Sequence, residues 1–201
     1  MSEDPRAGDR AMARFSAAMS GGVHCAAPYA KGAISADGAT ATSKSGPGWF
    51  RAVCETVARG GGVWEGALHR RSSSDTIVAL FICIGAPNAD TWHVSKNVLA
   101  KWVNTTGSYI RGSTAPGSVA LALPVGGTLS WRIDCAAGTV HARVDDGAWA
   151  LLFNDITPAE VASGLHVGVI LDGDAEVKLL SFGRVDAAAV PKAVAVRAPW
   201  G

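Results

Sequence analysis

Two short acidic clusters are the parts of this sequence that come nearest to catalytic chemistry. They are Asp145-Asp146 and Asp172-Gly173-Asp174. A glycosidase needs two carboxyl groups that face one groove, where they act as acid and as base or nucleophile. Both clusters lie among residues typical of turns, where Asp and Gly are ordinary. The second cluster also lacks the further oxygen ligands of a calcium loop, so we interpret both as turns.

The histidines and cysteines do not have the spacing of a metal site. The five histidines are scattered without the H-E-x-x-H spacing, and no C-x-x-C pair occurs. The sequence also lacks the G-x-S-x-G nucleophile elbow and a Gly-rich phosphate loop ending in Lys-Ser or Lys-Thr. We therefore expect no catalytic residue, no metal and no cofactor, and we do not expect an enzyme or a small-molecule ligand.

Composition and charge exclude several classes of protein. Lys and Arg number 18 and Asp and Glu number 17, so the net charge of +1 gives no general attraction to nucleic acid or acidic membranes. Hydrophobic residues make up 48% of the chain, too many for an intrinsically disordered protein. The most apolar run, Ile77 to Ala86, is shorter than the roughly 20 residues of a membrane-spanning helix. We expect neither nucleic acid nor membrane as a partner.

The N-terminal residues and the cysteines bear on the cellular compartment. Met1 to Arg6 is charged and does not resemble a secretory signal. Cys83 and Cys135 stand inside apolar runs, which is typical of buried thiols in a reducing compartment. We therefore expect a cytoplasmic protein.

The elements that must position any site are predicted to be strands. Short apolar or alternating runs separated by turn residues recur from residue 23 to residue 184, which predicts an all-β, antiparallel two-sheet β-sandwich. Asp146-Gly147 predicts a tight hairpin with a positive φ at Gly147, and residues 136–138 predict another. Only Thr157 to Ala162, with Pro158 and Glu160 in capping positions, predicts a short helix.

Two segments flank the predicted sandwich. In residues 1–22, Met12, Phe15 and Met19 share one stripe of a predicted helix, which either docks on its own domain or serves a partner. Residues 185–201 predict an extended arm that lies along the domain or becomes ordered on a partner. Because exposed Trp is unfavourable, Trp200 and the three apolar residues of the helix are our candidates for anchoring the protein in an assembly.

Tryptophan is unevenly used in the predicted sandwich. Trp64, Trp131 and Trp149 lie within or beside strand patterns, so we expect them in the core. Trp92 and Trp102 lie in a long span, residues 87–118, with few strand signals. Irregular spans on a rigid scaffold often carry binding residues, so these two are either loop anchors or partner contacts.

The order of motifs along the chain resembles that of SPRY domains. Gly127 to Asp134 resembles the family's Gly-Asp-x-Ile-Gly-x-x-Leu-Asp, and Gly138 to Gly147 resembles its Gly-Thr-Leu-x-Phe-x-x-Asn-Gly. Weaker matches precede and follow them in the expected order. These are Ile34 to Thr42, Gly48 to Val53, Val63 to Leu68, Ile82 to Gly85, Trp102 to Gly112, Leu151 to Ile156 and Leu165 to Val169.

The resemblance implies a concanavalin-like jelly roll that is a non-catalytic protein-interaction module, acting as an adaptor or as a subunit of a larger assembly. Ligand contacts would then come from loops at one end of the sandwich. The residues placed there by position are Arg51, Pro87, Asn88, Trp92, Trp102, Tyr109 and Asp146.

Two alternatives remain open at this point. A carbohydrate-binding or carbohydrate-cleaving protein of the same fold would place an exposed Trp92 or Trp102 beside Asp145, Asp146, Asp172 or Asp174. A coat or shell protein would also be a β-sandwich, and it would assemble with copies of itself.

Overall fold

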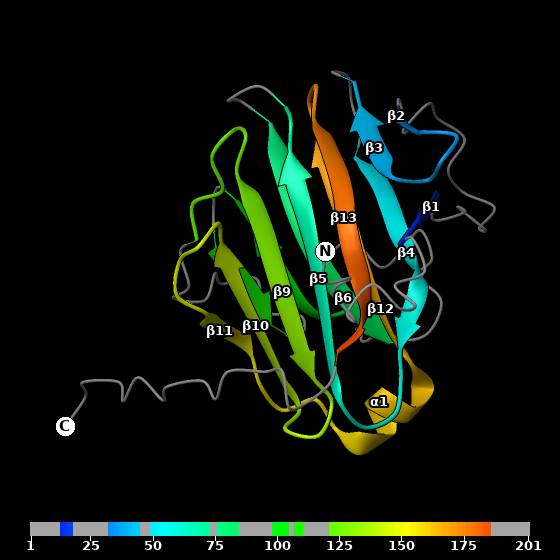
Figure 1. The fold of residues 1–201 in the computed structure, drawn as a ribbon, viewed down its shortest axis with the longest axis vertical. Helices are drawn as coiled ribbons and strands as arrows, with labels where there is room; N and C mark the ends of the chain where they lie inside the picture. The colour runs from blue at the N-terminus through cyan, green and yellow to red at the C-terminus, as the bar shows by residue number, and fades with distance from the viewer. Residues whose placement is uncertain are drawn as a thin grey trace, which may run out of the picture.

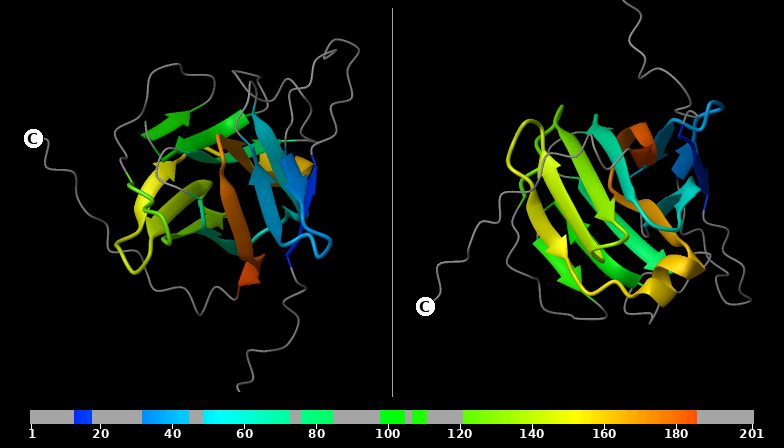
Figure 2. Two further views of the ribbon diagram at one scale, coloured as in Figure 1. Left: turned by 90° about the horizontal axis from the view of Figure 1, so that it is seen from above. Right: turned by 60° about the horizontal axis from the view of Figure 1, so that its bottom comes forward.

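The protein is an antiparallel β-sandwich of two sheets, seen in a computed structural model. The structure describes residues 13–17, 32–44, 49–72, 76–84, 98–104, 107–110 and 121–185. Figures 1 and 2 show the two layers packed face to face, with a single short helix at one end. The predicted all-β sandwich is therefore confirmed.

One sheet has six strands and the other has seven. In spatial order, the six-stranded sheet contains β1 (Phe15–Ala17), β4 (Phe50–Ala58), β12 (Leu165–Asp172), β6 (Ile77–Ile84), β7 (Val98–Val103) and β8 (Gly107–Ile110). The seven-stranded sheet contains β11 (Ala150–Phe153), β10 (Thr139–Val144), β9 (Thr128–Asp134), β5 (Val63–Arg70), β13 (Glu176–Val185), β3 (Thr40–Ser43) and β2 (Gly32–Ile34).

The inner faces of the two sheets form the main core. Trp131, on β9, packs against Phe182, on β13, with 5.9 Å between the ring centroids. Gly66 lies opposite Trp131 in the pairing of β5 with β9, and a Cβ at this position would overlap the indole ring. A glycine is therefore required here, because only a bare backbone leaves room for the buried Trp131.

The predicted hairpin between β9 and β10 is confirmed. Gly138 has φ 65°, and the Asp134 carboxylate accepts hydrogen bonds from the amides of Ala136 and Ala137. After β10 the chain turns as predicted, but the positive φ falls on Asp145, at 49°, and not on Gly147. Asp tolerates this conformation because its short side chain bonds to nearby backbone, and Asp145 accepts a 2.8 Å hydrogen bond from the amide of Thr128.

The predicted short helix is also confirmed, as α1 (Pro158–Ser163). The Thr157 hydroxyl accepts a hydrogen bond from the amide of Glu160, and the Glu160 carboxylate accepts one from the amide of Thr157. This capping box satisfies two amides that would otherwise lack partners.

The predicted N-terminal helix is wrong where the structure describes it. Residues Phe15–Ala17 form β1, which pairs with β4, and Phe15 is only 3% exposed in the main core. Arg14 and Phe15 add long-range hydrogen bonds to Glu55 and Gly38, which fix an extended conformation. Phe15 therefore anchors its own domain. The other proposed anchors, Met12, Met19 and Trp200, lie outside the described residues, as do residues 186–201.

The span 87–118 is less irregular than the sequence predicted. It contains β7 and β8, which extend the six-stranded sheet. Within the described residues, no helix is long and apolar enough to cross a membrane.

Candidate functional site

The outer face of the seven-stranded sheet carries a shallow groove of about 240 Å³. Its floor follows from the strand register, which pairs Arg143 with Ser130, Ser130 with Ala67, and Ala67 with Ser181. The last three of these side chains are small. Larger side chains surround them, so the middle of the sheet face is hollow.

The next row of paired residues forms one side of the hollow. It runs from His141 to Arg132, Glu65 and Gly183. A Cβ added to Gly183 would meet no atom within 4 Å, and this glycine does not have a positive φ. The floor is therefore open to solvent at Gly183.

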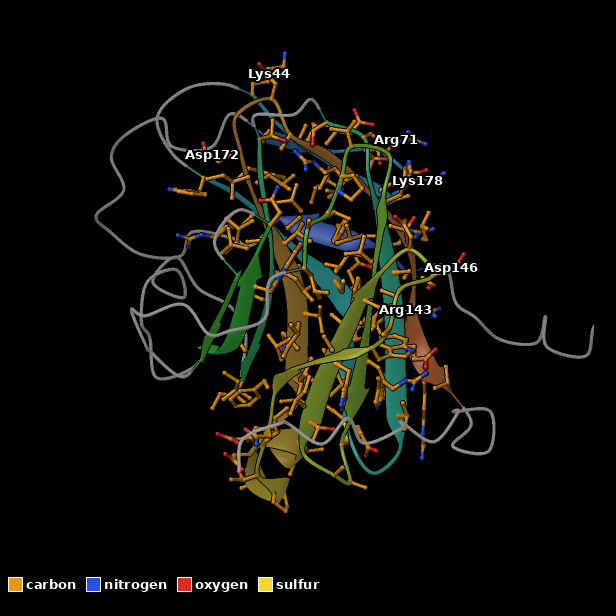
Figure 3. The ribbon with its side chains drawn as sticks, turned by 90° about the vertical axis from the view of Figure 1, so that its left-hand side faces the viewer. Lys44, Arg71, Arg143, Asp146, Asp172 and Lys178 are labelled. Carbon is orange, nitrogen blue, oxygen red and sulfur yellow. The ribbon has the colours of Figure 1, made fainter. Side chains whose placement is uncertain are left out.

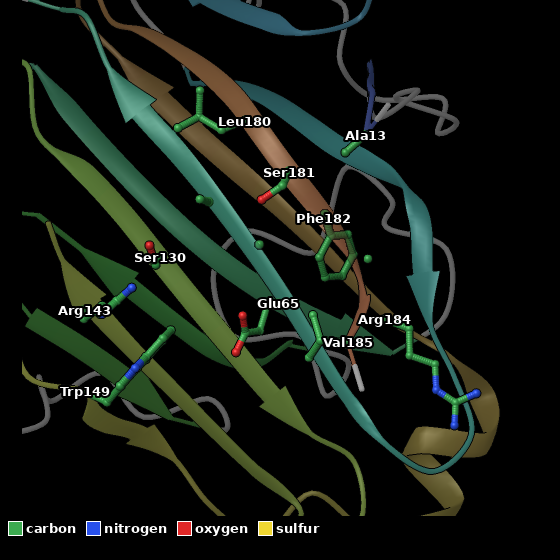
Figure 4. A pocket seen from close by; sticks show the side chains of 13 residues that line it. Ala13, Glu65, Ser130, Arg143, Trp149, Leu180, Ser181, Phe182, Arg184 and Val185 are labelled. Carbon is green, nitrogen blue, oxygen red and sulfur yellow. The ribbon is translucent and has the colours of Figure 1, made fainter. Parts of the chain in front are cut away.

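Each end of the groove carries one large apolar side chain. Trp149 precedes β11 and lies beside Arg143 at one end (Figure 4). At the other end a bulge between Leu179 and Ser181 turns Leu180 outward, where it is 51% exposed. We call the hollow bounded by Arg143, Trp149, Glu65, Leu180 and Val185 the sheet-face groove.

An ion pair and an aromatic ring organise the Trp149 end of the sheet-face groove. The Arg132 guanidinium donates a 2.6 Å hydrogen bond from Nε to the Glu65 carboxylate, and a second nitrogen lies 2.5 Å from the same oxygen. Arg132 and Arg143 both lie over the Trp149 ring, 4.4 Å and 4.8 Å from its centroid. Such cation–π contacts hold the three side chains in place.

The expectation that Trp149 lies in the core is therefore wrong. It is half-buried on the outer face, whereas Trp131 is fully buried and Trp64 packs against the core as expected. His141 lies on the same outer face, as the alternation of β10 requires. Burial, and then the positive charge of Arg132, lower the pKa of His141.

The sheet-face groove lacks the parts of a hydrolytic site. Neither Ser130 nor Ser181 bonds to a base within the described structure, and His69 instead lies 3.4 Å from the hydroxyl of Thr128. Burial raises the pKa of the Cys83 thiol to about 12 and also raises that of Cys54, so neither is a ready nucleophile. No group of His, Cys, Asp or Glu in the described part of the chain could hold a metal ion.

Those predicted partner-binding residues that the structure describes do not lie together. Trp102 is 1% exposed and points into the main core, so the expectation that it contacts a partner is wrong. Arg51 is half-buried on β4, and Tyr109 is on β8. Asp146 is exposed in the turn after β10, on the opposite sheet. Pro87, Asn88 and Trp92 lie outside the described residues, and their role stays a prediction.

The two acidic clusters also lie apart. Asp172 ends β12 in the six-stranded sheet, whereas Asp146 follows β10 in the seven-stranded sheet. Figure 3 shows them on opposite sides of the sandwich, with Arg143 close to Asp146. The expected pairing of these carboxylates with Trp102 across one groove is therefore wrong.

Sequence reasoning missed the residues that make the sheet-face groove. No binding motif marks Ala67, Ser130, Ser181 and Gly183, because small residues are common on solvent-facing strands. The usable signal was their place in the alternation, since each stands on the outward side of its strand. Leu180 gave no signal, because a bulge is needed to turn it outward.

Comparisons with known proteins identify the fold. No protein-family model and no curated protein sequence matches the chain. The SPRY domain of human HERC1 matches 75% of this chain and 92% of its own, with 16% identity and a TM-score of 0.55. The neuralized NHR1 domain of Drosophila melanogaster matches 85% and 98%, with 11% identity and a TM-score of 0.54.

A carbohydrate-recognition domain is also similar. That of Emp46p, in its potassium-bound form, covers 84% of this chain and 87% of its own, with 11% identity and a TM-score of 0.51. These likenesses show that the chain has the concanavalin-like sandwich fold found in SPRY domains.

Proposed function

We propose that this chain is a non-catalytic protein-interaction module that binds a partner segment in the sheet-face groove. SPRY domains with the same fold are generally binding modules of this kind. The observation that carries the proposal is the groove itself, a solvent-open hollow with one large apolar side chain at each end and a rigid frame of Trp149, Arg132 and Glu65. Such a preformed surface with an aromatic anchor suits recognition with little rearrangement.

The finer role that we propose is that of a cytoplasmic adaptor or of a subunit in a larger assembly. The near-neutral net charge of the chain and the absence of basic clusters favour protein over nucleic acid as partner. Asp146 stands in the turn between Arg143 and Trp149, so this predicted contact would border the same groove.

A pair of glycine variants tests the proposed function. Gly183→Leu adds a side chain to the open floor of the groove, where a Cβ meets nothing within 4 Å. Gly61→Leu is the matched control, because Gly61 is equally open but lies in the turn between β4 and β5. Both variants should unfold at nearly the wild-type temperature, since neither glycine has a positive φ.

The measurement is recovery of partner proteins by the tagged full chain under native conditions, with quantitative mass spectrometry. We expect at least about a tenfold loss of partner with Gly183→Leu and none with Gly61→Leu, because the leucine side chain added on the groove floor would occupy space that a bound segment needs. Equal recovery by the two variants would show that partners do not use the sheet-face groove.

Glycan binding is a second candidate, favoured by one observation. Trp149 is half-exposed beside the Ser130 hydroxyl, and an aromatic ring next to polar groups is a common sugar-binding arrangement. Against it, two guanidinium groups already lie over the Trp149 ring. A glycan array separates the two functions. Binding of a glycan by the wild-type chain that is abolished in Gly183→Leu would favour glycan as the ligand of the sheet-face groove.

A self-assembling coat or shell protein is the remaining alternative. Size-exclusion chromatography distinguishes it, because a shell protein would elute as a large particle and a binding module would not.

A further inference from the structure

Arg143 differs from its neighbour Arg132 in having no counter-ion. Arg132 is paired with the Glu65 carboxylate, whereas Arg143 makes a cation–π contact with the Trp149 ring and no ion pair within the described structure. The Nε atom of Arg143 is buried without a hydrogen-bond partner. Leaving a charged hydrogen-bond donor unsatisfied is unfavourable. An anionic group from outside the chain that accepts hydrogen bonds from Arg143 would therefore stabilise it.

The charge along the sheet-face groove favours the same partner. Among the described residues of its lining, Glu65 is the one acidic side chain, and Arg132 neutralises it. Arg184 lies beside Gly62 at the far end, directed away from Arg143 (Figure 4). Within the described lining, an anion entering at the Trp149 end would therefore meet the uncompensated positive charge of Arg143, and the exposed Asp146 in the turn after β10 lies outside this lining.

The dimensions of the floor suit an extended peptide. Adjacent strands lie ~4.8 Å apart, so the row from Arg143 to Ser181 spans roughly 14 Å, which is about four residues of extended chain. The Ser130 and Ser181 hydroxyls on this floor make no hydrogen bond within the described residues, so they could bond to a peptide backbone. Leu180, at the far end, offers contact to an apolar side chain.

We propose that the sheet-face groove recognises an extended peptide through an acidic side chain that pairs with Arg143, with an apolar side chain about four residues away, on the same face of the peptide, against Leu180. This inference rests on the proposed function and specifies the chemistry of the partner. The guanidinium fork of Arg143 matches a carboxylate with two parallel hydrogen bonds, which an amide does not reproduce.

The test uses nonapeptide libraries on the immobilised full chain. Three libraries are random except for a central Glu, Gln or Lys. We expect the Glu library to be retained at least about tenfold more than the Gln library, the size of effect typical of a hydrogen-bonded charge pair. Sequencing of the retained peptides should show an apolar residue enriched about four positions from the Glu, because side chains alternate between the two faces of an extended peptide.

Two charge variants locate the preference. Arg143→Gln should abolish the discrimination between Glu and Gln. Lys44→Gln removes the same charge from an exposed position far from the groove and should leave it unchanged (Figure 3). Thermal unfolding of both variants shows whether the fold is retained.

The outcomes separate this inference from the proposed function. Equal retention of Glu and Gln peptides, or a preference that survives Arg143→Gln, would overturn the acidic specificity. If Gly183→Leu still abolished retention of all peptides, the groove would remain the binding site. Retention that Gly183→Leu does not affect, or no retention of any library by the wild-type chain, would overturn both.

Discussion

The outer faces of the two sheets have opposite characters. On the six-stranded sheet, a second hydrophobic cluster of Val53, Ala79, Phe81, Cys83, Val103 and Ile170 is almost completely buried. On the seven-stranded sheet, the corresponding outward positions hold small, hydroxyl and charged side chains, including Ser130 and Arg143. Among the described residues, one sheet is therefore buried on both faces, whereas the outer face of the other carries polar side chains and the sheet-face groove.

This difference shows how a sandwich divides stability and recognition between its sheets. A sheet with two apolar faces gains burial energy twice but has no surface left for polar groups. A sheet with one polar face can carry an ion pair, an aromatic ring and a hollow without disturbing the core. Substitutions on the two faces should therefore have different consequences.

The largest contrast is expected between two apolar side chains on the opposite outer faces. Phe81, 3% exposed, packs against Gly168 in the second cluster, whereas Leu180 is 51% exposed. Phe81→Ala should lower the free energy of unfolding by about 3–5 kcal/mol, because it leaves a cavity. Leu180→Ala should change it by less than about 0.5 kcal/mol. Urea denaturation measures both, and a similar loss for the two variants would contradict the division between the faces.

The sequence was sufficient for the parts of the fold that are local. The hairpin of β9 with β10 and the capping box of α1 each depend on residues only a few positions apart, so turn and cap chemistry identified them. The N-terminal strand was missed because three residues do not define a strand by themselves. Phe15 is extended because β4 and Gly38 supply its hydrogen-bond partners.

The candidate site could not be predicted because its residues come from strands far apart in the sequence. The groove floor joins Ala67, Ser130 and Ser181, and their register depends on pairings of β5 with β9 and β13. The bulge before Ser181 shifts that register by one residue. Arg143 lies on the outer side of β10, and its neighbour Trp149 was expected in the core.

A smaller contrast is expected between two ion pairs of the seven-stranded sheet. Glu65 pairs with the nearly buried Arg132 through a 2.6 Å hydrogen bond, whereas Glu176 pairs with the exposed Arg71 at 3.4 Å. Glu65→Gln should lower the free energy of unfolding by about 1–2 kcal/mol, since the hydrogen bond is charged and partly shielded from water. Glu176→Gln should lower it by less than about 0.5 kcal/mol.

Chemical denaturation at low and at moderate salt provides the measurement. Screening by salt should reduce the small effect of Glu176→Gln further, because Glu176 and Arg71 are both exposed to solvent. Equal effects at the two positions would show that the frame of the sheet-face groove is no stronger than an ordinary surface pair.

The smallest effect concerns one histidine on each outer face. Burial lowers the pKa of His141, on β10, and the positive charge of Arg132 lowers it further. Burial likewise lowers the pKa of His166, on β12, and the positive charge of Arg59 adds to this effect. Because the folded state resists protonation, the unfolded state binds more protons as the pH falls through ~6.5. Stability should therefore be complete above that pH and decline below it, toward the lowered pKa of the folded state.

His141→Gln and His166→Gln should each flatten this decline by well under about 1 kcal/mol, since both rings keep partial contact with solvent. The measurement is the free energy of unfolding between pH 7.5 and pH 5. An acidic peptide bound beside Arg143 would add a negative charge near His141 and not near His166. This charge would favour protonated His141, so the peptide should reduce the part of the stability loss at low pH that comes from His141. A peptide effect that persists in His141→Gln, or that disappears in His166→Gln, would contradict this assignment of the two histidines to separate faces.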